Sequence, residues 1–317
     1  MGSLALLVDR RCSRLEVGPN QTLVARRKDG GCERVGLQAL GEVVLIGAVA
    51  LDSCVLLALA SHGVALSCLP LRGAERAALL LGPPMRGTHI RHAQHLAYAH
   101  PERRLALARI TVRHKIAAAE SLAATPAPDW ARAVADAPDL ASLMGVEGAA
   151  GKRHFQRLRT TLPPEWGFEQ RQRRPPPDPV NALLSLCYTL VLAPAAQLLA
   201  RAGLDPQLGF LHEMHRDRPA LVLDLIEAAR PHLDCFVVSL IAEGKLTPAH
   251  FHTQDGGGPR LDTTGRQLFY PRWFADGVAR ARGPMQALLA EWLKVLSTYA
   301  TPLDDDNADT GMRRESA

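Results

Sequence analysis

The sequence has few cysteines and none of the short repeats that mark common zinc sites. Its six cysteines lie far apart, with no CxxC pair among them. That spacing excludes a zinc ribbon and a disulfide-rich secreted scaffold, and is typical of small core residues in a reduced protein. An HExxH segment is also missing, so the usual helix of a zinc hydrolase is not encoded.

Long uncharged runs are scarce as well. One run, at 182–200, is long enough to span a membrane, but Ser185, Pro194 and Gln197 within it favour a buried core helix. Charged residues appear at Asp9 and Arg10, too early for a signal peptide. We therefore expect a cytoplasmic protein without a membrane span.

The 317 residues, 47% of them hydrophobic, are enough for two domains. Residues 1–85 contain short strand-type runs at 4–8, 14–17, 22–26, 43–48 and 64–69, separated by turn signals, with one helix at 53–61. No catalytic constellation is visible among these residues. We expect a small β-strand-rich, β-sandwich-like domain that serves scaffolding or self-association.

Beyond residue 85 the pattern changes to long helices, expected at 88–99, 103–123, 219–231 and 276–299, with another that begins at the cap Asp178-Pro179 and ends before Gly203. The predicted fold class is thus α+β with two domains. The boundaries are 1–85 for the β-rich domain, 86–303 for a larger all-α catalytic domain, and 304–317 for a polar tail that we expect to be disordered.

The helix expected at 219–231 carries a carboxylate inside an apolar run. Asp224 lies between leucines, where an unpaired charge costs several kcal/mol. Helical spacing puts Asp224 and Glu227 on one face with small alanines, opposite Val222 and Ile226. Asp217 is the candidate N-cap, and Pro231 is expected to close the helix. Alternatively, Asp224 forms an ordinary buried ion pair with Arg218 or Arg230.

Two histidines precede this helix. His212 and His215 are three residues apart, and a tight corner at 216–219 can fold them over the acidic pair. Imidazole together with hard carboxylate oxygens suits Mn²⁺ or Mg²⁺ better than a thiolate-seeking metal. The alternative is that both histidines lie on a helix surface and bind no metal.

A third acidic position, Glu147, lies between glycines in the segment LMGVEGAAG, where a backbone or ligand can approach closely. Its alternative explanation is a first-turn carboxylate favoured by the helix dipole. The chain then turns basic and includes Phe155, Trp166 and Phe168, a mixture that suits phosphates and unstacked bases. The basic residues are Lys152, Arg153, Arg157, Arg159, Arg171, Arg173 and Arg174.

Three segments together resemble a known family. LMGVEGAAGKRHF, RRPPPDPVNALLSLCYTLV and GLDPQLGFLHEMHRDRPALVLDLIEAARP are similar to those of the CRISPR-associated spacer-acquisition integrases, which are metal-dependent DNA endonucleases. The resemblance implies that Glu147, His212 and Glu227 jointly hold Mn²⁺ or Mg²⁺, with Asp224 as an accessory carboxylate. Expected nucleic-acid contacts are the basic residues above together with Asn181, Tyr188 and Arg218.

The resemblance also implies an assembly. It comprises a homodimer formed through the first domain, a small ferredoxin-like CRISPR adaptation subunit that bridges two dimers, and double-stranded DNA, both spacer precursor and CRISPR repeat. The chain departs from the family pattern at Gly151 and His154, where alanine and tyrosine are common, and at Asp217-Arg218, where glycine-arginine is frequent. None of these departures removes an expected ligand.

Two other functions remain open at the level of sequence. One is a non-catalytic nucleic-acid-binding scaffold whose acidic cluster is structural. The other is a zinc hydrolase built on His212 and His215, against which the missing HExxH spacing and the hard ligand set both argue.

Overall fold

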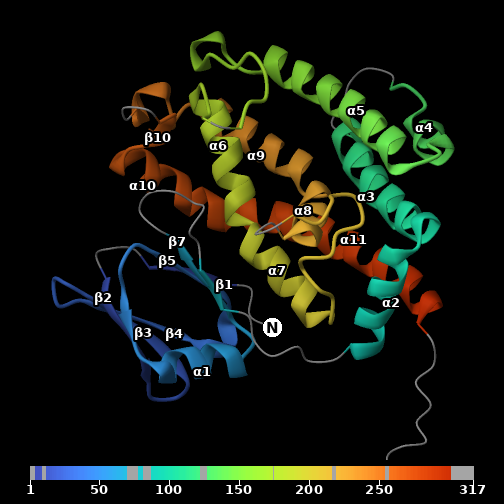
Figure 1. Cartoon of the computed structure of the whole chain (residues 1–317). Helices are drawn as coiled ribbons and strands as arrows, with labels where there is room; N and C mark the ends of the chain where they lie inside the picture. The colour runs from blue at the N-terminus through green and yellow to red at the C-terminus, as the bar shows by residue number, and fades with distance from the viewer. Residues whose placement is uncertain are drawn as a thin grey trace, which may run out of the picture.

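The computed structural model describes residues 4–8, 12–69, 78–80, 87–121, 127–173, 175–215, 219–253 and 257–300. The chain is a mixed α+β fold, strand-rich first and helical afterwards (Figure 1), and the predicted fold class is confirmed at this level. The expected tail at 304–317 lies outside the described residues.

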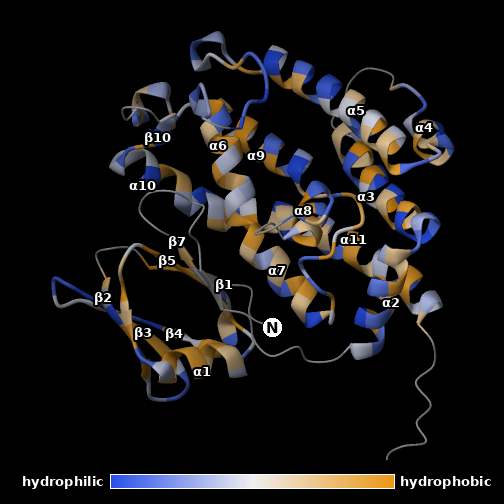
Figure 2. Cartoon of the chain, viewed as in Figure 1, coloured by the Kyte–Doolittle hydropathy of each residue, from blue (hydrophilic) through white to orange (hydrophobic). Residues whose placement is uncertain are grey.

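The strand-rich part contains two four-stranded sheets, ordered β1-β5-β7-β8 and β4-β3-β2-β6. Leu15 and Leu23 of one sheet share a buried cluster with Val43 and Leu45 of the other, as a sandwich-like arrangement requires. Figure 2 shows the hydrophobic character of β5 and α1 in this part. The strands are β1 Leu4–Val8, β2 Cys12–Gly18, β3 Thr22–Arg27, β4 Cys32–Gly36, β5 Leu40–Ile46, β6 Ala50–Leu51, β7 Ala65–Leu69 and β8 Ala78–Leu80, with helix α1 Ser53–Ser61.

The helical part has a separate buried cluster, formed by residues from Ile90 onward. Its helices are α2 Thr88–Ala99, α3 Pro101–Ser121, α4 Trp130–Asp136, α5 Leu140–Thr161, α6 Pro179–Leu190, α7 Leu192–Arg201, α8 Ala220–Glu227, α9 Arg230–Ala242, α10 Thr263–Arg272 and α11 Val278–Tyr299, with a short hairpin of β9 Phe251–Thr253 and β10 Pro259–Leu261.

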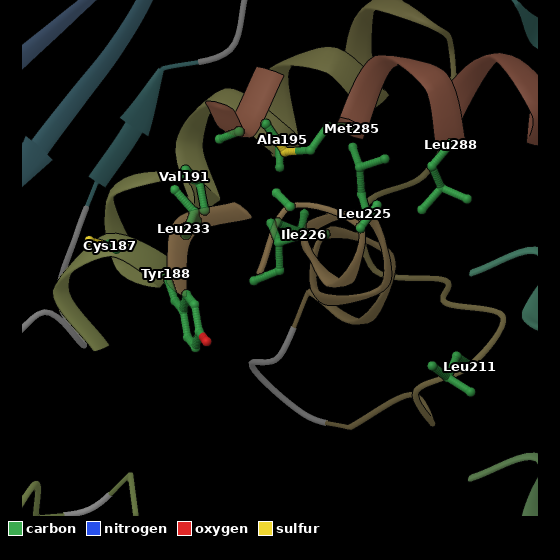
Figure 3. Packing of buried hydrophobic residues seen from close by; sticks show 14 of the residues in the cluster. Cys187, Tyr188, Val191, Ala195, Leu211, Leu225, Ile226, Leu233, Met285 and Leu288 are labelled. Carbon is green, nitrogen blue, oxygen red and sulfur yellow. The ribbon is translucent and has the colours of Figure 1, made fainter. Parts of the chain in front are cut away.

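Helix α8 lies in the middle of this part, in contact with α3, α7, α9 and α11. Leu225 and Ile226 pack among Ala195 of α7 and Met285 and Leu288 of α11 (Figure 3). Only one residue within α8, Leu223, is not fully buried. The fold therefore surrounds the two carboxylates of α8 with apolar side chains and leaves few places where charge can be balanced.

Prolines divide two helices that the sequence pattern predicts as continuous. The run at 182–200 is split at Val191 into α6 and α7, because Pro194 has no N–H to donate to the carbonyl of Leu190. The prediction that Pro231 closes α8 is wrong. Helix α8 ends at Glu227, and Pro231 lies in the first turn of α9. The predicted cap Asp217 lies outside the described residues.

The stretch Pro179–Arg201 is long and apolar enough to cross a membrane by length and composition alone, and 56% of its most apolar window is buried inside the protein. Leu183, Leu184 and Leu199 of this stretch are fully buried. This agrees with the prediction of core helices.

Candidate active site

Glu147 lies in the interior of α5 and not in its first turn. The N-terminal cap of α5 is Asp139, whose side chain accepts a hydrogen bond from the Ser142 amide. The helix-dipole explanation of Glu147 is therefore wrong, because Glu147 is two turns into the helix. A Cβ atom built on the neighbouring Gly148 would meet nothing within 4 Å, so there is open space beside the carboxylate.

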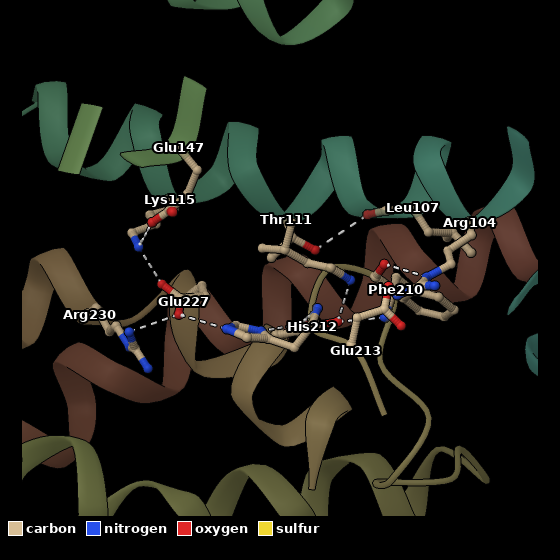
Figure 4. Close-up of polar contacts among 12 residues, drawn as sticks. Arg104, Leu107, Thr111, Lys115, Glu147, Phe210, His212, Glu213, Glu227 and Arg230 are labelled. Atoms are coloured by element: carbon tan, nitrogen blue, oxygen red, sulfur yellow. Dashed lines mark hydrogen bonds and ion pairs between the residues drawn. The ribbon is translucent and has the colours of Figure 1, made fainter. Parts of the chain in front are cut away.

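His212 lies in the loop between α7 and α8, and two helices fix that loop. The buried Gln94 of α2 donates to the carbonyls of Asp205 and Leu208, at 3.0 and 2.8 Å. Arg104 of α3 donates to the carbonyl of Phe210, 3.0 Å away (Figure 4). The backbone entering the histidine is thus held before any ligand arrives.

Asp224 of α8 binds the backbone of the same loop. Its carboxylate accepts hydrogen bonds from the backbone amides of Phe210, Leu211 and His212, at 2.6, 2.9 and 3.0 Å, and it is fully buried. Its Oδ1 atom also lies 2.6 Å from Nδ1 of His212. An ionised carboxylate only accepts, so Nδ1 carries the proton and Nε2 presents its lone pair.

Glu227 is almost completely buried and lies one turn beyond Asp224. Burial by itself raises the pKa of this carboxyl, but the charges of Arg230 and Lys115, together with a hydrogen bond from Lys115, outweigh burial and lower the pKa to about 2. Its Oε1 atom is 2.8 Å from Nη1 of Arg230 and 4.0 Å from Nε2 of His212. Glu227 is therefore ionised throughout the physiological range.

Lys115 of α3 joins the two glutamates. Its ammonium contacts Oε1 of Glu147 and lies 2.5 Å from Oε2 of Glu227 (Figure 4). Oε2 is buried, and the Lys115 ammonium is the polar group described beside it. Glu147 and Glu227 thus share one cation, and Nε2 of His212 lies 4.0 Å from the other oxygen of Glu227.

These donors suit a hard divalent cation. Within the described ranges no three His, Cys, Asp or Glu side chains stand close enough to form a metal cluster. The Lys115 ammonium lies between the carboxylates of Glu147 and Glu227. Two carboxylates and a neutral imidazole are nevertheless ligands that Mn²⁺ or Mg²⁺ accepts. The second nitrogen of the imidazole donates to a carboxylate, which is the usual support of a metal-ligating histidine.

A second polar network adjoins the site. Asp234 of α9 is buried, accepts a hydrogen bond from the Tyr188 hydroxyl, and lies 2.8 Å from Nε2 of His154. Burial, together with the Asp234 charge, raises the pKa of Tyr188, which therefore stays a donor. The guanidinium groups of Arg171 and Arg230 lie over its ring, 5.4 and 4.9 Å from the centroid.

Between this network and Glu147 there is a cavity of about 230 Å³. Its lining includes the side chains of Lys115, Lys152, Arg171, Arg173 and Arg230, and two carboxylates, those of Glu147 and Asp234. A cavity with this charge balance favours an anionic ligand next to the glutamates.

Comparison with known proteins identifies the family. Residues 6–274 match the family described as CRISPR associated protein Cas1. The CRISPR-associated endonuclease Cas1 3 of Thermus thermophilus is 36% identical over 272 residues, which cover 83% of this chain and 81% of the relative. The chain belongs to the Cas1 family.

Other Cas1 proteins support this assignment. The CRISPR-associated endonuclease Cas1 2 of Rhodospirillum rubrum is 33% identical over 264 residues, covering 76% of each chain. The fold is shared with a casposase bound to integration product, with a TM-score of 0.80, 20% identity and coverage of 100% of this chain and 96% of that one. A CAS1 protein from Thermotoga maritima gives a TM-score of 0.79 at 20% identity, covering 93% and 96%. The predicted family is confirmed, and the predicted role in CRISPR adaptation, as endonuclease and integrase, agrees with it.

The basic residues expected to bind nucleic acid divide into two groups within this Cas1 chain. Lys152, Arg171 and Arg173 line the cavity beside the glutamates. Arg153 and Arg157 instead pair with Glu120, at 3.4 and 2.9 Å, and Arg159 pairs with Glu169 at 2.6 Å. Arg174 and Arg218 lie outside the described residues.

The two polar residues of α6 differ in their accessibility. Asn181 is fully buried, where it accepts from the Gln172 amide and donates to the Gln170 carbonyl and to Asp178. These bonds give Asn181 a structural role, and we no longer expect it to contact nucleic acid. Tyr188 remains a candidate because it lines the cavity.

The sequence pattern missed Lys115, Arg230 and Asp234. Arg230 carried a signal, since it is three residues beyond Glu227 in the sequence, and it pairs with Glu227 across the turn between α8 and α9. It had been considered as a partner of Asp224, but Asp224 is held by His212 and the loop amides instead. His215 is exposed, and no metal-type cluster includes it among the residues that the structure describes.

Proposed function

We propose that this Cas1 protein cuts and joins DNA strands during CRISPR spacer acquisition, with Mn²⁺ or Mg²⁺ held by Glu147, His212 and Glu227. The observation that carries the proposal is that Glu147 of α5 and Glu227 of α8 share one cation, with Nε2 of His212 4.0 Å from Glu227. The relatives named as endonucleases and the casposase bound to integration product support the same chemistry.

When bound, such a cation polarises a phosphodiester and stabilises charge on the attacking and leaving oxygens. Either water or a DNA 3′-hydroxyl can then serve as the nucleophile. Attack by water would cut the strand, whereas attack by a 3′-hydroxyl would break one phosphodiester bond of the repeat, form a new one to the incoming strand, and release the displaced hydroxyl of the repeat strand as leaving group.

The side chains of the chain have separate roles in this proposal. We assign Asp224 an orienting role in place of the accessory metal ligation expected from the resemblance: it keeps the proton on Nδ1 of His212 and leaves Nε2 to bind metal or carry a proton. Arg230 holds Glu227 in position and keeps it ionised. The cations of the cavity meet the phosphates of the strand beside the glutamates.

We further propose that double-stranded DNA and a small ferredoxin-like CRISPR adaptation subunit are partners, and that residues 1–85 form the homodimer while 86–303 form the catalytic domain. Solved structures of a Cas6-RT-Cas1–Cas2 complex and a Cas1–DNA complex share this fold and support DNA and a Cas subunit as partners. The separate buried clusters of the two parts support the division.

The test is strand cleavage and strand joining on branched and linear DNA, with Mn²⁺, Mg²⁺, Zn²⁺ or EDTA. We expect activity with Mn²⁺ or Mg²⁺, loss of activity in EDTA, and a decrease of at least about 100-fold in Glu147→Gln, His212→Ala and Glu227→Gln. Glu243→Gln is the matched control, because this exposed glutamate pairs with Arg272 away from the site.

Two outcomes would favour other functions. Tight DNA binding without strand chemistry under any metal, unaffected by Glu147→Gln, would indicate a scaffold. Activity with Zn²⁺ alone that is lost in His215→Ala would indicate a zinc hydrolase.

A further inference from the structure

Lys115 stands between the two glutamates that the proposed function assigns to the metal. Its side chain is 16% exposed, and those of Glu147 and Glu227 are 25% and 3% exposed. Helix α3 packs against both α5 and α8, so the position of the lysine between the two carboxylates is set by helix packing.

The local charges show what the ammonium does there. Arg230 neutralises Glu227 at Oε1, but Oε2 is buried and has no hydrogen bond, so it depends on Lys115. Without a cation at this point, the charge of Glu227 would be only partly compensated and the carboxylate of Glu147 would lie near it. A buried charge without compensation costs several kcal/mol. Lys115 is therefore the counter-ion of the glutamate pair.

A metal ion bound to the same oxygens cannot share the position with the ammonium. Carboxylate oxygens bind Mg²⁺ at about 2.0–2.1 Å, closer than the 2.5 Å between Nζ and Oε2. A divalent cation and an ammonium on one oxygen also repel each other strongly in a partly buried site. Metal loading therefore requires Lys115 to leave.

The cavity next to the glutamates is the place open to the displaced side chain. Lys115 already forms part of its wall, with Lys152, Arg173 and Arg230. Another ammonium placed among these cations is unfavourable unless an anion enters with it. A DNA phosphate supplies that anion.

We propose that Lys115 is a displaceable counter-ion that couples metal binding to strand binding: it competes with the metal for Glu147 and Glu227, and it moves to a phosphate when DNA enters the cavity. This inference rests on the proposed metal site and assigns a positioning role to a residue outside the ligand set. Because coupling is reciprocal, DNA raises metal affinity by the factor by which metal raises DNA affinity.

The experiment measures Mn²⁺ binding to the full chain by electron paramagnetic resonance, with and without a short DNA oligonucleotide. Without DNA, we expect Lys115→Met to bind Mn²⁺ at least about tenfold more tightly than wild type, because no ammonium has to be displaced. With DNA, wild-type affinity increases, and that increase is largely absent in Lys115→Met. Lys152→Met removes a cavity cation for which the structure describes no ion pair with either glutamate, and its Mn²⁺ affinity without DNA should match that of wild type.

A second measurement uses the wild-type chain and therefore does not depend on whether Lys115→Met folds. Acetylation of Lys115 by a succinimidyl ester, followed by mass spectrometry, should speed up severalfold when Mn²⁺ is added without DNA, relative to Lys152. Equal or weaker Mn²⁺ binding by Lys115→Met, or an unchanged acetylation rate, overturns the inference. Mn²⁺ binding that Glu147→Gln and Glu227→Gln leave unchanged would instead overturn the metal site itself.

Discussion

The Nδ1 atom of His212 lies 2.6 Å from Oδ1 of Asp224, and the same carboxylate accepts three backbone amides of the loop that carries the histidine. One buried side chain thus determines both the path of the backbone and the direction of the imidazole ring. The site depends on Asp224 although Asp224 need not touch metal or substrate.

We therefore expect Asp224→Ala to be the most destabilising of the site substitutions. It leaves three buried amides without acceptors, and the free energy of unfolding should fall by about 3–5 kcal/mol. Thermal and urea unfolding measure this loss. Glu147→Ala is the comparison, since Glu147 is partly exposed and bonded only through Lys115 in the contacts described; equal losses in the two variants would contradict the role given to Asp224.

The close approach at Gly209 gives a second test. A Cβ atom there would lie 2.8 Å from Cβ of Ala220 and 3.0 Å from Oδ2 of Asp224. Gly209→Ala should destabilise the fold by about 1–3 kcal/mol, as overpacking does. Gly145→Ala is the matched control, because it lies in α5 with nothing within 4 Å, and should be neutral or stabilise by up to about 1 kcal/mol. Urea unfolding of both variants decides the point, and similar losses would refute it.

Asp234 should couple energetically to His154. Each of Asp234→Asn and His154→Phe should cost about 1–3 kcal/mol, because each leaves a buried polar group with an imperfect partner. The double variant should cost less than the sum of the two, by about 1 kcal/mol or more. A double-mutant cycle from unfolding curves measures this difference, and strict additivity would show that the contact carries no energy.

The buried carboxyl of Glu42 in β5 should make the stability of the fold depend on pH. Burial raises the pKa of this carboxyl to about 7, against a lowering by the Ser67 hydroxyl at 3.3 Å; His62, Arg201 and Arg282 line the same cavity. Because the folded pKa is raised, the stability contributed by the protonated form is complete below about pH 4.5 and is lost as the pH rises through 7. Glu42→Gln should therefore stabilise the protein by about 1–3 kcal/mol at pH 8 and have little effect near pH 4. Unfolding curves at the two pH values are the measurement, and an equal effect at both would exclude a raised pKa.

Local sequence signals predicted helices α1 and α2 to the residue, and strand β3 to within one residue, because turn residues and periodicity mark their ends. The breaks before α7 and α9 required a different reading of Pro194 and Pro231, which act in the first turn of the following helix. Strand β4 was missed because its side chains are mostly exposed and show little hydrophobic alternation.

The candidate site also divides into residues that local sequence signals mark and residues that only tertiary packing identifies. Glu147, His212 and Glu227 could be proposed from the sequence because each lies in a distinctive segment. Lys115 could not, because it belongs to a helix with many basic residues, and only packing of α3 against α5 and α8 distinguishes it. The role of Asp224 likewise depends on a loop path that no periodicity encodes.

Helix α11, at the end of the described residues, supports the histidine loop from behind. Trp292 of α11 is fully buried, lies edge-on to the Phe210 ring and donates to the Leu107 carbonyl of α3. The wall behind the histidine loop is therefore supplied by a segment made after all the proposed ligands. A chain that ends before Trp292 would contain Glu147, His212 and Glu227 but would lack this packing against the histidine loop.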